Sequence, residues 1–272
     1  MLEPAARRVL VNGVPLRPDG SHFRELPMVL FHPDHVEMVR GGPDGRRRFL
    51  DRALFQADAR YPTIHRDYLR ALASRNRLLR QRPPDQRSLA LFEEQLAQNG
   101  ERLIGLRRFF IGELSPLYIE AATHIGQGRG ASIAYRPSLD GDRAALVEAW
   151  GRSRGRDLEL GHTAAGPHAD DLLLELDGRP ARRFASQGQQ RTLALALKIA
   201  ETRVLEAATG RTPLLLLDDV SSELDRERNR RLFEFLVAAG GQVFITSTHE
   251  DHILAGRPRA DYCVEDGRVS VV

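Results

Sequence analysis

Four consecutive leucines, Leu214 to Leu217, are followed at once by the two aspartates Asp218 and Asp219. A short, continuously apolar run is typical of a central strand in a parallel sheet, which helices cover on both faces. Open α/β sheets place their ligands at the carboxyl ends of such strands. Burying two adjacent carboxylates is costly unless a cation or hydrogen bonds compensate them. We therefore expect a magnesium site here; the alternative is that one carboxylate caps a turn and the other is solvated.

A second motif precedes this strand. Ser186 and Gln189 have the spacing of a capping box, and strong helix-forming sequence then continues to about residue 208, before Thr209-Gly210. A helix N-terminus attracts anions, because its free N–H groups and its dipole point outward. The segment Ser186-Gln187-Gly188-Gln189 is therefore a candidate phosphate-binding site, and the alternative is an ordinary capped core helix.

Two further candidates follow the aspartates. Ser222-Glu223-Leu224-Asp225 has the composition of a helix start, and we expect that helix to end near Ala238. The segment Val243–Ile245 reads as the next strand, and it ends in Thr246-Ser247-Thr248-His249. In a parallel sheet this strand can neighbour the strand of Asp218, which would bring His249 to the same edge.

Along the rest of the chain, the predicted secondary structure changes from strands to helices near residue 46 and to alternating strands and helices near residue 129. Asn12-Gly13 predicts a hairpin within residues 8–17. Strands are expected at 27–31, 131–135 and 172–176, a turn at Asp177-Gly178, and helices at 46–59, 63–81, 85–98, 102–125 and 142–153. Asn99-Gly100 separates two of these helices, and Pro116 is expected to kink or divide the last one before residue 126. The pattern predicts one α/β unit, residues 1–45 and 129–272, interrupted by a helical subdomain at 46–128.

Composition limits the setting of the protein. The 272 residues include 40 basic and 37 acidic residues, a formal charge of +3 that is too small to show a nucleic-acid partner. The single cysteine, Cys263, excludes an internal disulfide, indicates a reducing compartment and is expected in a buried strand. We find no apolar signal segment and no run approaching a membrane span, so we expect a cytoplasmic protein.

Every basic residue except Lys198 is arginine, and eleven arginines crowd residues 46–82. Arg66, Arg70 and Arg77 have spacings that place them on one helix face. Such a face suits the phosphates of a DNA backbone, and the alternative is a solvated surface.

Taken together, the motifs resemble the ABC ATPase heads of the SMC and RecF families, and the likeness to the RecF family is closer. It spans nearly the whole chain, and four runs carry it: Phe184–Arg191, Leu217–Asp225, Gly166–Asp171 and Arg46–Asp51. The resemblance implies an ABC-type ATPase head, similar to P-loop NTPases, with a largely parallel sheet and a helical insertion.

The resemblance also implies residue roles. Ser186, Gln187, Gly188 and Gln189 would contact the γ-phosphate of an ATP held by the other subunit. Asp218 would order Mg²⁺ through water, and Asp219 would position or activate the attacking water. Asp225 would belong to the D-loop at the dimer interface, and His249 would sense the γ-phosphate.

Five positions depart from the family pattern or lack an assigned role. His32 stands near the Q-loop position, where ABC proteins usually have glutamine. Ala169 replaces a basic residue that is frequent in the family. His168, Asp170 and Asp171 match a family motif to which we assign no role from the sequence.

For partners, the resemblance implies an ATP-dependent homodimer that binds single-stranded DNA and single-strand/double-strand junctions. It also implies work with RecO and RecR in loading the RecA recombinase, in DNA replication, recombinational repair and the SOS response.

No Gly-rich loop ending in Lys-Ser or Lys-Thr occurs in the sequence. We expect the chain to be a fragment or to have a misassigned start; the alternatives are that it pairs with a separate N-terminal piece or that it is a relative unable to hydrolyse ATP. Alone, the chain is expected not to bind ATP measurably. Two other functions stay open. One is a non-hydrolysing DNA- or partner-binding remnant of an ABC head, and the other is a two-metal phosphoesterase using Asp170, Asp171, Asp218 and Asp219.

Overall fold

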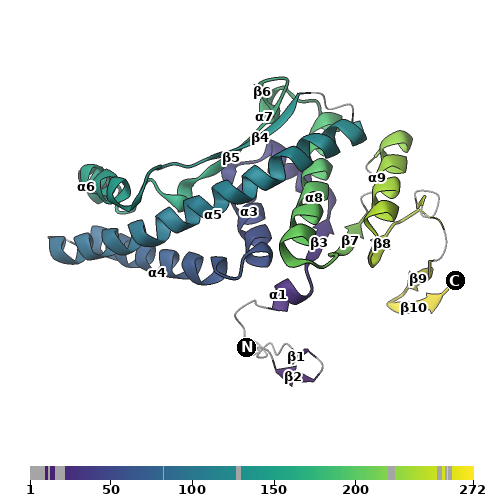
Figure 1. Cartoon of the computed structure of the whole chain (residues 1–272), viewed down its shortest axis with the longest axis horizontal. Helices are drawn as coiled ribbons and strands as arrows, with labels where there is room; N and C mark the ends of the chain where they lie inside the picture. Colours follow the sequence, from purple (N-terminus) through teal and green to yellow (C-terminus); the bar gives the residue numbers. More distant parts are fainter. Residues whose placement is uncertain are drawn as a thin grey trace.

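The structure of the chain is a computed structural model that describes residues 10–11, 13–15, 22–81, 83–126, 130–219, 224–249, 253–254, 256 and 259–272. Figure 1 shows long helices beside small sheets. The described elements, in chain order, are β1 (Leu10–Val11), β2 (Val14–Pro15), α1 (His22–Glu25), β3 (Met28–Phe31), η1 (Pro33–Val36), α2 (Glu37–Arg40), α3 (Pro43–Ala57), α4 (Tyr61–Leu79), α5 (Gln86–Gly126), β4 (Ala131–Arg136), α6 (Arg143–Leu160), η2 (Pro167–Ala169), β5 (Asp171–Leu176), β6 (Arg179–Pro180), α7 (Ala181–Phe184), α8 (Gln187–Thr209), β7 (Leu214–Asp218), α9 (Arg226–Ala239), β8 (Val243–Thr246), β9 (Tyr262–Glu265) and β10 (Arg268–Val271).

The leucine run forms the middle strand of a parallel sheet, as predicted. The sheet has the order β3–β7–β8, with Leu217 opposite Phe31 on one side and Ile245 on the other. Burial alternates along β7: Leu215 and Leu217 are buried, whereas Leu214 and Leu216 are only partly buried. The expectation of full burial on both faces is therefore wrong for the described part of the sheet.

A second sheet, β4–β5–β6, is antiparallel, so the described strands are less uniformly parallel than the sequence suggested. Its strands β4 and β5 pair along their whole lengths. The predicted turn after β5 is confirmed: Asp177 and Gly178 have φ of 53° and 70°, the left-handed values that favour Asp-Gly. The predicted hairpin near the start of the chain is also present as the pair β1–β2.

Helix α5 is continuous over 41 residues, so the predicted break at Asn99-Gly100 is wrong. Gly100 serves packing instead. A Cβ added at this position would lie 3.5–3.6 Å from side-chain atoms of Leu146, Trp150 and Pro167, which close over the helix. Pro116 likewise stands inside the helix without dividing it. Tertiary packing on α4, α6 and α8 thus overrides the local helix-breaking signals.

Two smaller expectations need correction. Helix α6 continues to Leu160, seven residues beyond the predicted end, because its last turns carry the buried Asp157. Cys263 lies in strand β9 as predicted, but it is only half-buried and the flanking residues of the strand are exposed. The proposed division at residues 46 and 128 stays a prediction.

The packing of α4, α5 and α6 depends on one fully buried guanidinium. Arg75 of α4 donates to Glu93 of α5 at 3.0 Å, and to Asp157 of α6 and the Thr163 hydroxyl at 2.7 Å each. Arg154 also pairs with Glu93. These partners compensate the cost of burying the charges, which would otherwise be large.

We expect Arg75→Met to lower the free energy of unfolding by about 3–5 kcal/mol, because two buried carboxylates lose their shared cation. Chemical denaturation at neutral pH measures this. The control is Arg152→Met, since Arg152 pairs with Glu148 on the exposed side of α6, and its loss should cost no more than about 1 kcal/mol. Equal stability of the two variants would contradict the interpretation of the buried network.

Candidate functional site

Asp218 ends β7 at the carboxyl edge of the parallel sheet, and two neighbours fix its carboxylate. Thr246, its register partner on β8, donates its hydroxyl to Asp218 Oδ1 at 2.7 Å. On the other side, His32 Nε2 lies 3.5 Å from Asp218 Oδ2. The side chain is 53 % exposed. The edge therefore presents an oriented carboxylate that solvent and ligands can reach.

Asp219 has left-handed backbone geometry, with φ of 48°. Its N–H donates to the Thr246 carbonyl at 3.1 Å, which continues the pairing with β8 one residue beyond β7. Aspartate is one of the few residues other than glycine that adopts this conformation at modest cost, and such geometry is frequent at functional sites. The second carboxylate is therefore carried on a backbone that departs from strand geometry.

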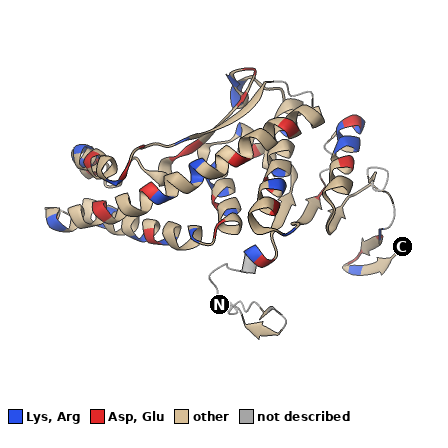
Figure 2. Ribbon diagram, in the orientation of Figure 1, with Lys and Arg blue, Asp and Glu red and all other residues tan. Residues whose placement is uncertain are grey.

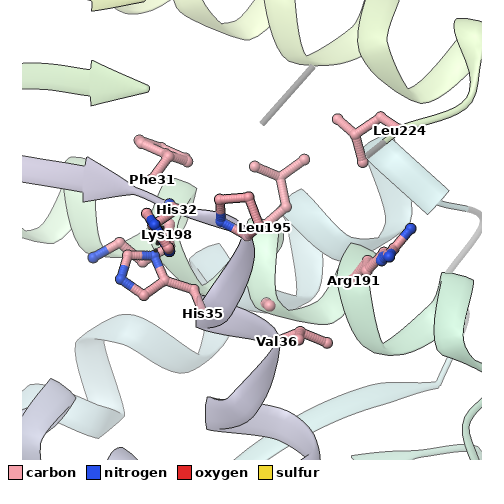
Figure 3. Close-up of a pocket in the computed structure, with 10 residues that line it drawn as sticks. Phe31, His32, His35, Val36, Arg191, Leu195, Lys198 and Leu224 are labelled. Carbon is pink, nitrogen blue, oxygen red and sulfur yellow. Dashed lines mark hydrogen bonds between the residues drawn. The ribbon is translucent and has the colours of Figure 1, made fainter. Parts of the chain in front are cut away.

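His32 follows β3 and caps the short helix η1. Its Nδ1 accepts from the Asp34 N–H at 3.1 Å, and this bond places the proton of a neutral imidazole on Nε2, the atom nearest Asp218. Next to it, burial and the charges of Lys198, Arg52 and His32 lower the pKa of His35 to about 3. Figure 3 shows His32, His35 and Lys198 around one pocket between η1 and α8.

The predicted capping box at Ser186 is present. The Ser186 hydroxyl oxygen accepts from the Gln189 N–H at 3.3 Å, and Gln189 Oε1 accepts from the Ser186 N–H at 2.8 Å. Gln187 and Gln189 are exposed, and Gly188 is half-buried. The Ser186 hydroxyl is used as an acceptor, so its hydrogen can still be donated to an anion.

The start of α8 touches the start of α9. Asp225 caps α9 through the Arg228 N–H at 2.9 Å and pairs with the Arg228 guanidinium at 2.8 Å. A Cβ at Gly188 would lie 3.3 Å from Arg228 Nη1. Three of the predicted site residues, Ser186, Gly188 and Asp225, therefore share one surface, and Arg228 joins them. Sequence reasoning missed Arg228, although its position three residues after an N-cap aspartate is a usable signal.

His249 follows β8 at the edge that carries Asp218, as predicted, and its side chain is exposed. Its backbone N–H donates to the Ser247 hydroxyl at 3.1 Å. Its role as a phosphate sensor stays a prediction. Ser222 and Glu223, which belong to the predicted helix start before Asp225, lie outside the described residues.

The C-terminal end of α5 lies beside the start of α8. Gly126, the last residue of α5, packs so closely on Thr192 that an added Cβ would lie 2.1 Å from the Thr192 methyl carbon. Thr192 is one turn after Gly188, and its hydroxyl donates to the Gly188 carbonyl at 3.0 Å. The start of α8 is therefore in contact with α5.

The arginines of the helical region fall into two groups. Arg66, Arg70 and Arg77 are exposed on α4, as predicted, although Asp67 lies near the first two. Arg46 and Arg75, in contrast, are buried in ion pairs and cannot belong to a solvated face. Figure 2 shows blue and red segments interspersed along the helices, so basic and acidic residues alternate along the chain there.

The motif Gly166–Asp171 has a structural role that the sequence did not reveal. Asp170, which is buried, binds Arg107 of α5 at 2.9 Å, the Tyr135 hydroxyl and the Ser138 N–H. Asp171 binds Arg46 of α3 through two hydrogen bonds of 2.7 and 2.9 Å. The motif thus connects the antiparallel sheet to the helices.

These contacts count against the two-metal phosphoesterase. Asp170 and Asp171 belong to the segment of the antiparallel sheet and are occupied by arginines, whereas Asp218 belongs to the parallel sheet. Within the described part of the chain, no three His, Cys, Asp or Glu side chains are grouped as metal ligands would be.

None of the described helices has a stretch that is apolar and long enough to cross a membrane.

A parallel strand that ends in carboxylates and a capped helix start beside the N-cap aspartate of the next helix are the features of an ABC-type ATPase head. The chain's curated relatives narrow this class. A RecF from Anaeromyxobacter sp. (strain Fw109-5) is 45 % identical over 282 residues, covering 98 % of this chain and 75 % of the relative. RecF from Myxococcus xanthus (strain DK1622) is 44 % identical over 254 residues, which cover 89 % of this chain and 67 % of the relative. The chain belongs to the RecF family of DNA replication and repair proteins.

Solved structures agree with this assignment. The recombination mediator protein RecF in its ATPrS form matches with a TM-score of 0.86 and 31 % identity over 97 % of this chain and 73 % of that chain. An Smc head bound to part of ScpA matches at 13 % identity with a TM-score of 0.50, which supports the fold alone. No protein-family model matches the chain.

The cluster around Asp51 should make part of the stability of the fold sensitive to acid. Burial opposes ionisation of Asp51, but hydrogen bonds from His65 and Tyr61 and the charge of Arg107 hold its pKa at about 2, below the ordinary 3.8. The resulting stabilisation is present above pH 3.8 and is lost as the pH falls toward 2.

In denaturant titrations, wild type should therefore lose roughly 2 kcal/mol more than Asp51→Asn between pH 5 and pH 2.5. A parallel pH dependence of the two proteins would refute the low pKa of Asp51.

Proposed function

We propose that this chain acts as an ATP-responsive, DNA-binding subunit of RecF type. The observation that carries the proposal is the surface on which Ser186, Gly188 and Asp225 meet through Arg228. Such a surface offers N–H groups, a hydroxyl and a guanidinium to one anion. The γ-phosphate of an ATP held by a second RecF subunit fits this chemistry, and binding it would close a dimer.

The edge of the parallel sheet fits a magnesium ion. Mg²⁺ in nucleotide sites usually takes one or two carboxylates and completes its shell with waters and phosphate oxygens. Asp218 offers an exposed carboxylate that Thr246 and His32 keep oriented. Asp219 stands beside it, where a carboxylate can orient the water that attacks the γ-phosphate. His249 would report on the same phosphate from the neighbouring strand.

For DNA, we propose the exposed face of α4. Arg66, Arg70 and Arg77 lie on one side of this helix, and Asp67 offsets only part of their charge. Arginines in this arrangement can contact successive phosphates without reading bases. The solved relatives are the recombination mediator protein RecF of the RecFOR pathway in its ATP and ATPrS forms. Binding of single strands and junctions, partnership with RecO and RecR, and loading of RecA by this chain belong to the proposal.

The nucleotide surface can be tested with Ser186→Asp. Aspartate caps a helix as well as serine, so the variant should keep its fold, but its charge should repel the γ-phosphate. Myxococcus xanthus RecF loaded with ATP supplies the second subunit. We expect wild type to form an ATP-dependent complex in analytical ultracentrifugation and Ser186→Asp to lose at least tenfold in affinity.

Unchanged thermal unfolding of Ser186→Asp is the required control. An ATP-dependent complex that forms equally well with this variant would overturn the assigned role of the α8 start.

The DNA surface can be tested with the triple variant Arg66→Gln, Arg70→Gln, Arg77→Gln. Fluorescence anisotropy with a labelled duplex should show weaker binding and a shallower dependence on salt, by about 0.9 in the log–log slope for each phosphate that is no longer neutralised. The matched control replaces three acid-paired arginines, Arg152, Arg230 and Arg143, with glutamine. A triple variant that binds DNA with the affinity and salt slope of this control would refute the α4 face.

A further inference from the structure

A stretch without any acidic residue surrounds the start of α8. Between Asp177 and Glu201 the sequence contains four arginines and one lysine but no aspartate or glutamate. Three of these arginines, Arg179, Arg182 and Arg183, are exposed on β6 and α7. No acidic side chain pairs with them within the ranges that the structure describes. Figure 2 shows blue segments where Figure 1 labels β6 and α7.

An exposed aromatic ring lies among these charges. Phe184, the last residue of α7, is 60 % exposed. The Arg179 guanidinium carbon lies 5.6 Å from the centre of this ring, within cation–π distance. The pair offers a flat apolar face next to positive charge, so it fits a ligand with both negative charge and flat rings.

The ring is held on a fixed backbone. Gln190 of α8, which is buried, directs its side-chain amide at the carbonyls of Ala181, Arg182 and Ala185, at 3.4, 3.5 and 3.1 Å. The Ala185 N–H closes the short helix by donating to the Ala181 carbonyl. Ala181 is fully buried. Because both ends of α7 are anchored, the exposure of Phe184 is a property of the fold.

We propose that Phe184, with Arg179, Arg182 and Arg183, forms a contact site for single-stranded DNA, in which a base stacks on the Phe184 ring and the arginines hold the adjacent phosphates. Cationic surfaces with exposed aromatic residues bind single strands in this way. A duplex fits less well, because its bases already stack on one another. The inference deepens the DNA-binding function proposed above and rests on it, but it uses a different surface from the α4 face.

The experiment uses Phe184→Trp in the full chain. The one native tryptophan, Trp150, is fully buried, so a new signal at position 184 can be separated from it. Addition of a twelve-residue oligo-dT should quench the emission of the new tryptophan, and a duplex of the same length should quench it much less. Phe109→Trp is the matched control, because Phe109 is 70 % exposed on α5 and has no part in this site.

Two further variants test the parts of the site. Phe184→Ala should weaken oligo-dT binding about tenfold, the effect expected for one stacked base. Arg182→Gln with Arg183→Gln should reduce the salt slope by about 0.7 for each phosphate of the single strand that the variant no longer neutralises.

Three results would overturn the proposal. The first is emission from the Phe184→Trp variant that saturating oligo-dT leaves unquenched. The second is equal competition by tripolyphosphate at matched charge, which would reduce the site to simple anion binding. The third is a change in the emission of this variant that follows protein concentration without DNA, which would make this surface a contact between copies of the chain.

The outcome is separable from that of the α4 face. Loss of duplex binding in the α4 triple variant, together with an unquenched Phe184→Trp variant, would leave the proposed function intact and remove this site alone. An α4 triple variant with unchanged duplex binding, together with quenching by oligo-dT, would do the reverse.

Discussion

The structure depends on one buried cation more than on any other interaction. Arg107, on the middle of α5, donates to Asp51 of α3, to the Tyr61 hydroxyl of α4, and to the Pro167 carbonyl and Asp170 beside η2. A guanidinium in an apolar interior is stable only when nearly all of its donors have partners. Meeting this requirement brings three helices and the strand connection of the antiparallel sheet to one point. The arrangement of the site follows, since Arg46 and Asp171 extend the same junction along α3.

Helix α3 carries this junction to the parallel sheet. Its first turns hold Asp171 and the Asp170 carbonyl, and at its other end Gln56 bonds both the N–H and the carbonyl of Met28. Met28 begins β3, the strand that ends just before His32. The side chain that faces Asp218 is therefore positioned through β3 from a helix whose opposite end lies at the buried ion pairs. The ordered carboxylate edge and the arginine network are parts of one framework.

Much of this could be predicted from the sequence, and the failures have physical causes. The leucine strand, the capping box and the neighbouring strand of His249 follow from local patterns, and the structure contains all three. Gly100 led to a wrong prediction of a helix end. It is glycine because Trp150, which is distant in sequence, packs closely on the helix at this position. Arg46 and Arg75 resembled surface residues because nothing local reveals that their carboxylate partners come from 125 and 82 residues away. Arg228 was missed because its neighbour Gly188 lies on another helix.

The unbroken course of α5 has a mechanical consequence. A helix of 41 residues is about 60 Å long, because each residue adds roughly 1.5 Å. One end presses Gly126 against Thr192, one turn beyond Gly188, and the distant part packs on α4 and α6. A stiff rod of this length amplifies small rotations: a tilt of about 5° at one end displaces the other by about 5 Å. A small rotation of α5 beside the start of α8 would therefore displace the helices that carry the exposed arginines by several times as much.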